Sequence, residues 1–263
     1  MMASPITVIL VNLLAVTAMM IVGWLVSLRQ RNVTIVDALW GMGFVIITWI
    51  TAVAGDGYVV RAWLLALLVS LWGLRLGIYM VWRSHGKGED PRYGSWRRQY
   101  GDRFWIVSLF NVFLVQALFL WVISLATQFG QMARTPASLT GLDLIGAVIW
   151  LIGFVFETVG DWQLARFKAD PSNSGKVMDR GLWAYTRHPN YFGEALIWWG
   201  IWLIVLSTPN SWWTIVSPLL ITITLLKITG IALTEKTILE KKAEYRDYMD
   251  RTNAFLPWFP KRR

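Results

Sequence analysis

The chain has 263 residues, of which 56% are hydrophobic and only 16% are charged, a balance that excludes an ordinary soluble domain and indicates an integral membrane protein. It contains no Cys and only two His, so disulfides and Cys-based redox sites are excluded and we predict no metal centre. The net charge of +9 is typical of basic loops in a polytopic protein, and we predict no nucleic-acid partner.

Apolar segments of about 20 residues, long enough to cross a bilayer, recur along the chain. They predict seven transmembrane helices in an all-α, polytopic membrane protein with a single domain over residues 1–263. The predicted spans lie near 5–28, 33–54, 60–82, 105–127, 142–166, 190–207 and 211–233, followed by a cytoplasmic tail helix over 234–252. The first segment is too long, and lacks the preceding basic residue, for a cleavable signal peptide.

Positive charge alternates strictly between the predicted connections. The first, third and fifth connections and the tail contain all but four of the 25 Lys and Arg residues; the exceptions are Arg61, Arg75, Arg134 and Lys227. The positive-inside rule therefore places the N-terminus outside and the C-terminus in the cytoplasm, which requires an odd number of spans. We expect a bacterial inner-membrane protein whose polar site faces the cytoplasm.

Several polar residues lie within or at the ends of the predicted spans, where a charge is costly and a functional role is the default interpretation. Asp37 shares a helix face with Trp40 and Gly41 in the second span, while Glu157 and Asp161 are four residues apart in the fifth. Structural alternatives remain open: Arg75 in the third span can snorkel to lipid phosphates, and the acidic pair can mark a solvated helix end.

The connection between the fifth and sixth spans mixes basic residues with Trp183, Tyr185 and Tyr191. Basic groups bind phosphates, aromatic faces stack on flat rings, and Asp, Asn and Glu accept hydrogen bonds from ribose hydroxyls. The pattern favours a phosphorylated nucleotide at the inner membrane face, and an ordinary basic loop with aromatic anchors remains an equal alternative. No Gly-x-Gly-x-x-Gly follows a strand, so a Rossmann site is not expected.

The stretch Gly181-Leu-Trp-Ala-Tyr-Thr-Arg-His-Pro-Asn-Tyr-Phe-Gly-Glu194 resembles the C-terminal cofactor-binding region of the steroid 5α-reductase-like family. It is most similar to that family's poorly characterised bacterial branch, which also shows the Asp-x-x-Trp-Gly element matched by Asp37–Gly41. The ending from Tyr245 to Pro260 is similar as well. The Arg-His-Pro element is shared with sterol reductases and with membrane isoprenylcysteine and phospholipid methyltransferases.

The resemblance implies a seven-helix membrane enzyme that uses NADPH to reduce an activated C=C bond in a lipid or steroid-like enone. It assigns the cofactor to residues along the fifth connection and its flanks: Arg75, Glu157, Asp161, Lys168, Tyr185, Arg187, His188, Asn190, Tyr191, Glu194 and, in the tail, Arg251. Trp72 stands where the steroid enzymes place a Tyr that donates to the substrate carbonyl. We therefore predict Asp37, kept protonated, and Tyr79 as the catalytic donors.

Two other functions remain as alternatives. An S-adenosylmethionine-dependent methyltransferase fits the Arg187–Pro189 turn and Glu235, although those enzymes usually have an adjacent Glu-Glu pair where this chain has Glu235 and Lys236. A non-enzymatic lipid-binding protein leaves Asp37 and Asp161 without a role. In each case we expect membrane lipids as partners. For the reductase we expect a lipid-like substrate that enters from the bilayer. We also expect the reductase to be a monomer.

Overall fold

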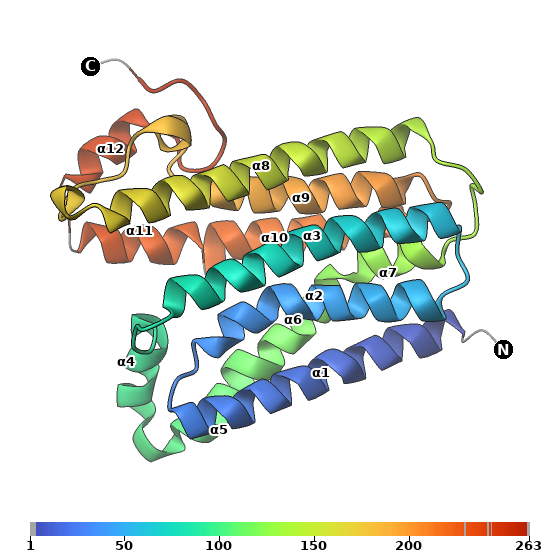
Figure 1. Cartoon of the computed structure of the whole chain (residues 1–263), viewed down its shortest axis with the longest axis horizontal. Coiled ribbons are helices and arrows are strands. Elements are labelled where there is room, and N and C mark those ends of the chain that lie inside the picture. The colour runs from blue at the N-terminus through green and yellow to red at the C-terminus, as the bar shows by residue number, and fades with distance from the viewer. Residues whose placement is uncertain (1–3, 229, 241, 243, 262–263) are drawn as a thin grey trace. The chain divides into compact units, whose positions relative to one another are not determined.

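The computed structural model describes residues 4–228, 230–240, 242 and 244–261, and every regular element among them is helical. The helices, labelled in Figure 1, group into two compact units. Unit 1 comprises Met1–Thr140 and Val205–Thr214, and unit 2 comprises Gly141–Ile204 and Ile215–Arg263. The prediction of one domain over 1–263 stays a prediction.

Unit 1 is built from helices α1 to α7. They are α1 (Pro5–Gln30), α2 (Ile35–Ala54), α3 (Val59–Ser84), α4 (Pro91–Tyr100), α5 (Phe104–Ser108), α6 (Val115–Ile123) and α7 (Leu125–Met132). A 3-10 turn at Gly101–Arg103 and a π-helical turn at Leu109–Leu114 link α4 to α6. The predicted span near 105–127 is therefore part of a longer, irregular helical segment, Pro91–Met132.

A buried polar cluster joins α1, α2 and α7 within unit 1. The Asn12 side-chain amide donates to the Thr51 hydroxyl at 2.8 Å and to the Gln128 side-chain oxygen at 2.9 Å. The Gln131 amide donates to the main-chain oxygens of Thr48 and Ala62. Such bonds between apolar helices supply association energy where the hydrophobic effect is weak, so this cluster fixes helix register.

Unit 2 contains α8 (Gly141–Ala169), most of α9 (Pro189–Leu206), α10 (Val216–Ile223), α11 (Ile231–Leu239) and α12 (Tyr245–Arg251). A π-helical turn at Thr224–Ile228 separates α10 from α11. The segment between α8 and α9 contains 3-10 turns at Pro171–Asn173 and Gly181–Ala184. The predicted tail helix over 234–252 is corrected: α11 begins earlier, as the end of a long apolar segment, and α12 is a separate helix.

Glycines let α8 and α9 approach each other closely. A Cβ on Gly153 would lie 2.6 Å from the Gly193 carbonyl oxygen, and one on Gly200 would lie 2.6 Å from the Gly146 oxygen and from the Trp150 nitrogen. These glycines recur every seven residues on each helix, which keeps them on one face. The first turn of α9, which is part of the predicted nucleotide site, is thereby held against α8.

Among the residues that the structure describes, six helical segments are long and apolar enough to cross a membrane, which indicates an integral membrane protein. They are Pro5–Gln30, Ile35–Ala54, Val59–Ser84, Pro91–Met132, Gly141–Ala169 and Trp212–Leu239. The predicted sixth span near 190–207 corresponds to α9, an 18-residue helix whose polar first turn and tryptophans lower its hydropathy. Seven spans and the orientation of the chain stay predictions.

Replacing Gly200 with Ala tests the close contact between α8 and α9. The new methyl group has no room beside the Gly146 and Trp150 main chain, so we expect a loss of about 1–3 kcal/mol in unfolding free energy. Thermal unfolding in detergent measures it. Gly141→Ala is the matched control, because a Cβ there meets no atom within 4 Å; equal melting temperatures for the two variants would contradict the packing argument.

Candidate functional site

The predicted site residues are divided between the two units. Asp37, Arg75 and Tyr79 belong to unit 1, whereas the predicted cofactor residues from Glu157 to Arg251 belong to unit 2. Two separate constellations therefore result, each described below by the contacts inside its own unit.

In unit 1, Asp37 lies in the first turn of α2 and is held by residues of α4. Tyr93 donates its hydroxyl to one carboxylate oxygen at 3.0 Å, and Arg92 lies 3.3 Å from the other. Both partners favour the charged carboxylate, whereas burial opposes it. The role of Asp37 as an acid stays a prediction. Tyr93 is a partner of Asp37 that the sequence does not predict, because its segment is expected to be a loop, whereas the structure forms α4 there.

The start of α4 is fixed against the start of α2 by two acidic residues. Asp90 caps α4 and its main-chain N–H donates to the Thr34 hydroxyl, while Glu89 accepts from the Val33 N–H at 2.9 Å. Burial acts to raise the pKa of Glu89, but the Arg97 guanidinium and the Val33 N–H outweigh it and hold that pKa below its usual range. Asp37 therefore lies in a polar corner between the starts of α2 and α4, where these contacts already fix its surroundings.

Arg75 and Tyr79 are neighbours on α3, as one helical turn predicts. The Arg75 guanidinium lies 5.6 Å from the centre of the Tyr79 ring, a cation–π distance. Trp72, one turn before, is fully buried and packs on the Phe44 ring with centroids 5.4 Å apart. Trp72 is therefore a core residue. Tyr79, and not Trp72, is the residue that offers a polar group on this face of α3.

In unit 2, the acidic residues of α8 meet the start of α9. The Asn190 side-chain amide donates to the Asp161 carboxylate at 3.2 Å, and Gly160 packs directly beneath Pro189 and Asn190. Glu157 and Asp161 are both buried. The side-chain oxygen of Asn190 is buried without a hydrogen-bond donor, which leaves an acceptor available for a ligand.

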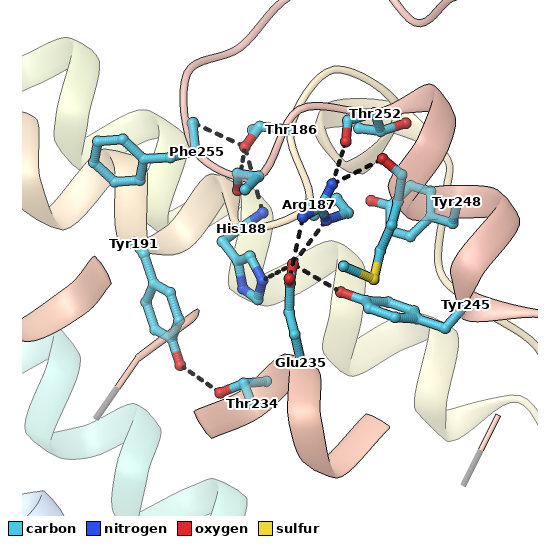
Figure 2. A network of polar contacts seen from close by, with 12 residues as sticks. Thr186, Arg187, His188, Tyr191, Thr234, Glu235, Tyr245, Tyr248, Thr252 and Phe255 are labelled. Atoms are coloured by element: carbon cyan, nitrogen blue, oxygen red, sulfur yellow. Dashed lines mark hydrogen bonds and ion pairs between the residues drawn. The ribbon is translucent and has the colours of Figure 1, made fainter. Parts of the chain in front are cut away.

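Arg187 and His188 are engaged in a buried network with Glu235 of α11, shown in Figure 2. Arg187 donates from Nε and Nη2 to the two oxygens of Glu235, at 2.7 and 3.1 Å, and from Nη1 to the Met249 and Thr252 carbonyls. His188 Nε2 lies 3.0 Å from the same carboxylate. With its guanidinium surrounded by protein acceptors, Arg187 positions the loop before α9 rather than presenting itself to a phosphate.

Aromatic residues complete this network. The His188 and Tyr191 rings stack with centroids 5.2 Å apart, and the Tyr191 hydroxyl lies 3.4 Å from that of Thr234. Tyr245 donates to Glu235, and Tyr248 donates to the Trp183 carbonyl. Burial raises the pKa of both Tyr245 and Tyr248 well above the usual range, so each stays a neutral donor.

The remaining predicted residues have less central places. Tyr185 is about half exposed and contacts the Phe259 ring, and Lys168 is exposed at the end of α8. Arg251 donates to the Asp247 carbonyl and lies 3.7 Å from Asp179, so it is a partly exposed tail contact. Glu194 is partly buried one turn after Asn190. Sequence reasoning left out Tyr248, whose hydroxyl supports the loop, because only the fold brings α12 to Trp183.

A cavity of about 290 Å³ opens beside the C-terminal end of α8 and the connection that follows it. Its lining includes the rings of Trp162 and Phe167 and the side chains of Arg166, Asp170 and Arg180. The Arg166 guanidinium lies 5.6 Å from the centre of the Trp162 ring. Two cations and an aromatic ring suit a phosphate with an attached flat ring, and Trp162 directly follows Asp161 on α8.

Within the described ranges, no group of three or more His, Asp or Glu side chains could hold a metal ion.

Comparison with known proteins places the chain in a family. A family model matches residues 23–252. The chain belongs to the family described as "Protein of unknown function (DUF1295)". An uncharacterized protein of Schizosaccharomyces pombe is 29% identical over an alignment of 267 residues. The alignment covers 89% of this chain and 75% of that protein. No solved structure matches. The family description leaves activity open, so a functional argument rests on the two constellations.

Removing the negative charge of Glu235 should destabilise unit 2 strongly. Glu235→Gln leaves the Arg187 guanidinium buried without its counter-charge, and breaking such a pair typically costs about 3–5 kcal/mol. Thermal unfolding measures the loss, with Glu240→Gln as the control because Glu240 is exposed at the end of the same helix. A melting temperature equal to that of the control would show that the network is not structural.

His188 gives the fold a specific dependence on pH. Burial lowers its pKa below 6.5, and the neighbouring Arg187 adds to this, although the hydrogen bond to Glu235 opposes the shift. Near pH 6.5 the unfolded chain therefore binds a proton at His188 that the folded chain does not bind. The free energy of unfolding consequently falls as pH drops below that value. The slope from this one group is at most about 1.4 kcal/mol per pH unit.

Thermal unfolding between pH 7.5 and 5 tests this, because Glu89 and Asp90 have lowered pKa values and contribute only in more acidic solution. His188→Gln should remove most of the slope, whereas His85→Gln should leave it unchanged. An identical slope in all three proteins would contradict the assignment.

Proposed function

We propose that the chain is a membrane-embedded NADPH-dependent reductase of an activated C=C bond in a lipid or steroid-like enone. The observation that carries this proposal is the pair of Asp161 and Asn190, with the buried side-chain oxygen of Asn190 lacking a donor. A ribose hydroxyl or a carboxamide N–H of a nucleotide would supply that donor. The resemblance of residues 181–194 to the steroid 5α-reductase-like family points to the same residues.

The neighbouring groups fit the other parts of such a cofactor. The cavity at Trp162 offers an aromatic face, and Arg166 and Arg180 offer cations for phosphate groups. Arg187 and His188 act in this proposal through position, because they hold the connection that leads into Asn190. The bound cofactor supplies a hydride, and the protein supplies orientation and a polar environment.

The predicted donors to the substrate lie in unit 1. Reduction of an enone places negative charge on the carbonyl oxygen, which a preorganised donor stabilises. Asp37 and Tyr79 are the predicted donors, and Tyr93, whose hydroxyl touches Asp37, is a third hydroxyl in the same constellation. The proposed topology has seven spans, an external N-terminus and a cytoplasmic cofactor face, with substrate entering a monomer from the bilayer of a bacterial inner membrane.

A methyltransferase that uses S-adenosylmethionine is the second candidate. The contact that favours it is the pairing of the Arg187–His188 turn with Glu235, because the resemblance to the membrane methyltransferases rests on these same elements. Against it, Lys236 stands where a second Glu is usual, and Asn190 with Asp161 better fits a nicotinamide nucleotide. The two functions differ in the cofactor that the folded chain binds.

Thermal unfolding in detergent with NADPH, NADH or S-adenosylmethionine added separately distinguishes the candidates. A ligand at a hundredfold excess over its Kd stabilises the folded state by about 2.7 kcal/mol, and we expect this shift with NADPH. Asn190→Leu should abolish the shift because it removes both the acceptor and the contact with Asp161, whereas Asn111→Leu, at an exposed position, should retain it.

A shift with S-adenosylmethionine and none with NADPH would reverse the order of the two candidates. The ligand-free melting temperature of Asn190→Leu, measured in the same series, shows whether that variant is folded. An unchanged NADPH shift in this variant would remove Asn190 from the site.

A further inference from the structure

The segment that follows α12 is a strap, residues 252–261, whose path is fixed by hydrogen bonds within unit 2. Its main chain bonds to the connection that precedes α9 and to the end of α12. The bonds are Arg187 N–H to Asn253 O at 2.9 Å, Trp258 N–H to Tyr185 O at 2.9 Å, and Lys261 N–H to Arg251 O at 3.0 Å. The course of the strap is therefore held by main-chain hydrogen bonds as well as by the packing of Phe255 on Phe192.

Three large apolar side chains of the strap are largely exposed, although the Phe259 ring also contacts Tyr185. Leu256, Trp258 and Phe259 are 64%, 70% and 74% exposed, although they lie within four residues of one another. These three residues form an exposed apolar patch, in which the Trp258 and Phe259 ring centroids lie 6.4 Å apart, and exposed apolar patches mark interaction surfaces. Lys261 follows the patch, and Arg262 and Arg263 come next in the sequence.

Aromatic contacts place the strap beside the apolar part of a membrane-spanning helix. Phe255, the inward-facing residue of the strap, contacts the Phe192 ring at 5.8 Å, and Phe192 contacts Phe156 of α8 at 5.2 Å. Phe156 lies within Gly141–Ala169, one of the apolar helical segments.

We propose that the strap is an interfacial membrane anchor whose partner is the lipid bilayer, with Leu256, Trp258 and Phe259 inserted at the boundary between headgroups and acyl chains. Trp and Phe favour this boundary, and apolar segments lying in it are buried about 5–10 Å deep. The basic end of the strap meets the phosphates, as juxtamembrane Lys and Arg residues do on anionic membranes. The charge and the apolar patch thus select the same partner.

The anchor has a consequence for the network of Glu235. The strap supplies the carbonyl of Thr252 to the Arg187 guanidinium and that of Asn253 to the Arg187 main chain. Lipid contact with the strap therefore also holds the connection that leads into Asn190. This inference concerns the bilayer and does not depend on which cofactor, if any, unit 2 binds.

The absence of Cys makes the test direct, since a single introduced thiol can be spin-labelled in the full-length chain. Leu256→Cys and Phe259→Cys are labelled and reconstituted into vesicles of phosphatidylcholine and phosphatidylglycerol, with Asp250→Cys as the control on the exposed face of α12. Collision with oxygen, which concentrates in the bilayer, is compared with collision with a water-soluble nickel chelate. All three substituted positions are exposed, so the variants should fold.

We expect the labels at 256 and 259 to report a depth of about 5–10 Å below the phosphates and the label at 250 to report water. Access of the nickel chelate to positions 256 and 259 equal to its access to 250 would overturn the anchor. Protection of both positions from both reagents would also overturn it, because it would show that protein and not lipid covers the patch.

Discussion

One carboxylate, that of Glu235, organises the part of unit 2 around the start of α9. A buried charge in an apolar protein must be paired and hydrogen-bonded, and Glu235 obtains both from Arg187 and His188. Arg187 in turn needs acceptors for its remaining N–H groups and finds them in the carbonyls of Met249 and Thr252. This requirement ties α11, α12, the strap and the connection before α9 into one polar assembly, although these segments are distant in the sequence.

That assembly separates two kinds of residue which the sequence motif mixes. Arg187 and His188 belong to the same short motif as Asn190, but their side chains are directed at Glu235, whereas Asn190 is directed at Asp161. The first two maintain the shape of the loop, and the third retains an oxygen that no protein donor reaches. A basic residue next to a candidate cofactor site is thus not by itself a phosphate ligand, because its donors can be consumed within the protein.

Unit 1 shows the same constraint with a different result. Asp37 is paired on one oxygen with Arg92 and receives a hydroxyl from Tyr93 on the other, so the polar corner between α2 and α4 joins a carboxylate, a phenol and a cation. The buried amides of Asn12, Gln128 and Gln131 join the far end of α2 to α1 and α7. Polar contacts within the apolar helices therefore determine which side chains converge, and hydropathy decides only that helices form.

The sequence by itself determined the membrane class, the helical architecture and most helix positions, since about 20 apolar residues in a row have few other solutions. It also pointed to Asp161 and Asn190, which the structure brings together, because an acidic helix end and a motif with a Pro at the next helix start are local signals. Tertiary structure alone decided that α4 contacts Asp37, that the tail divides into α11, α12 and a strap, and that Glu235 takes the donors of Arg187. These are pairings between segments separated by roughly 50 residues or more, and side-chain periodicity carries no information about which distant segment supplies a partner.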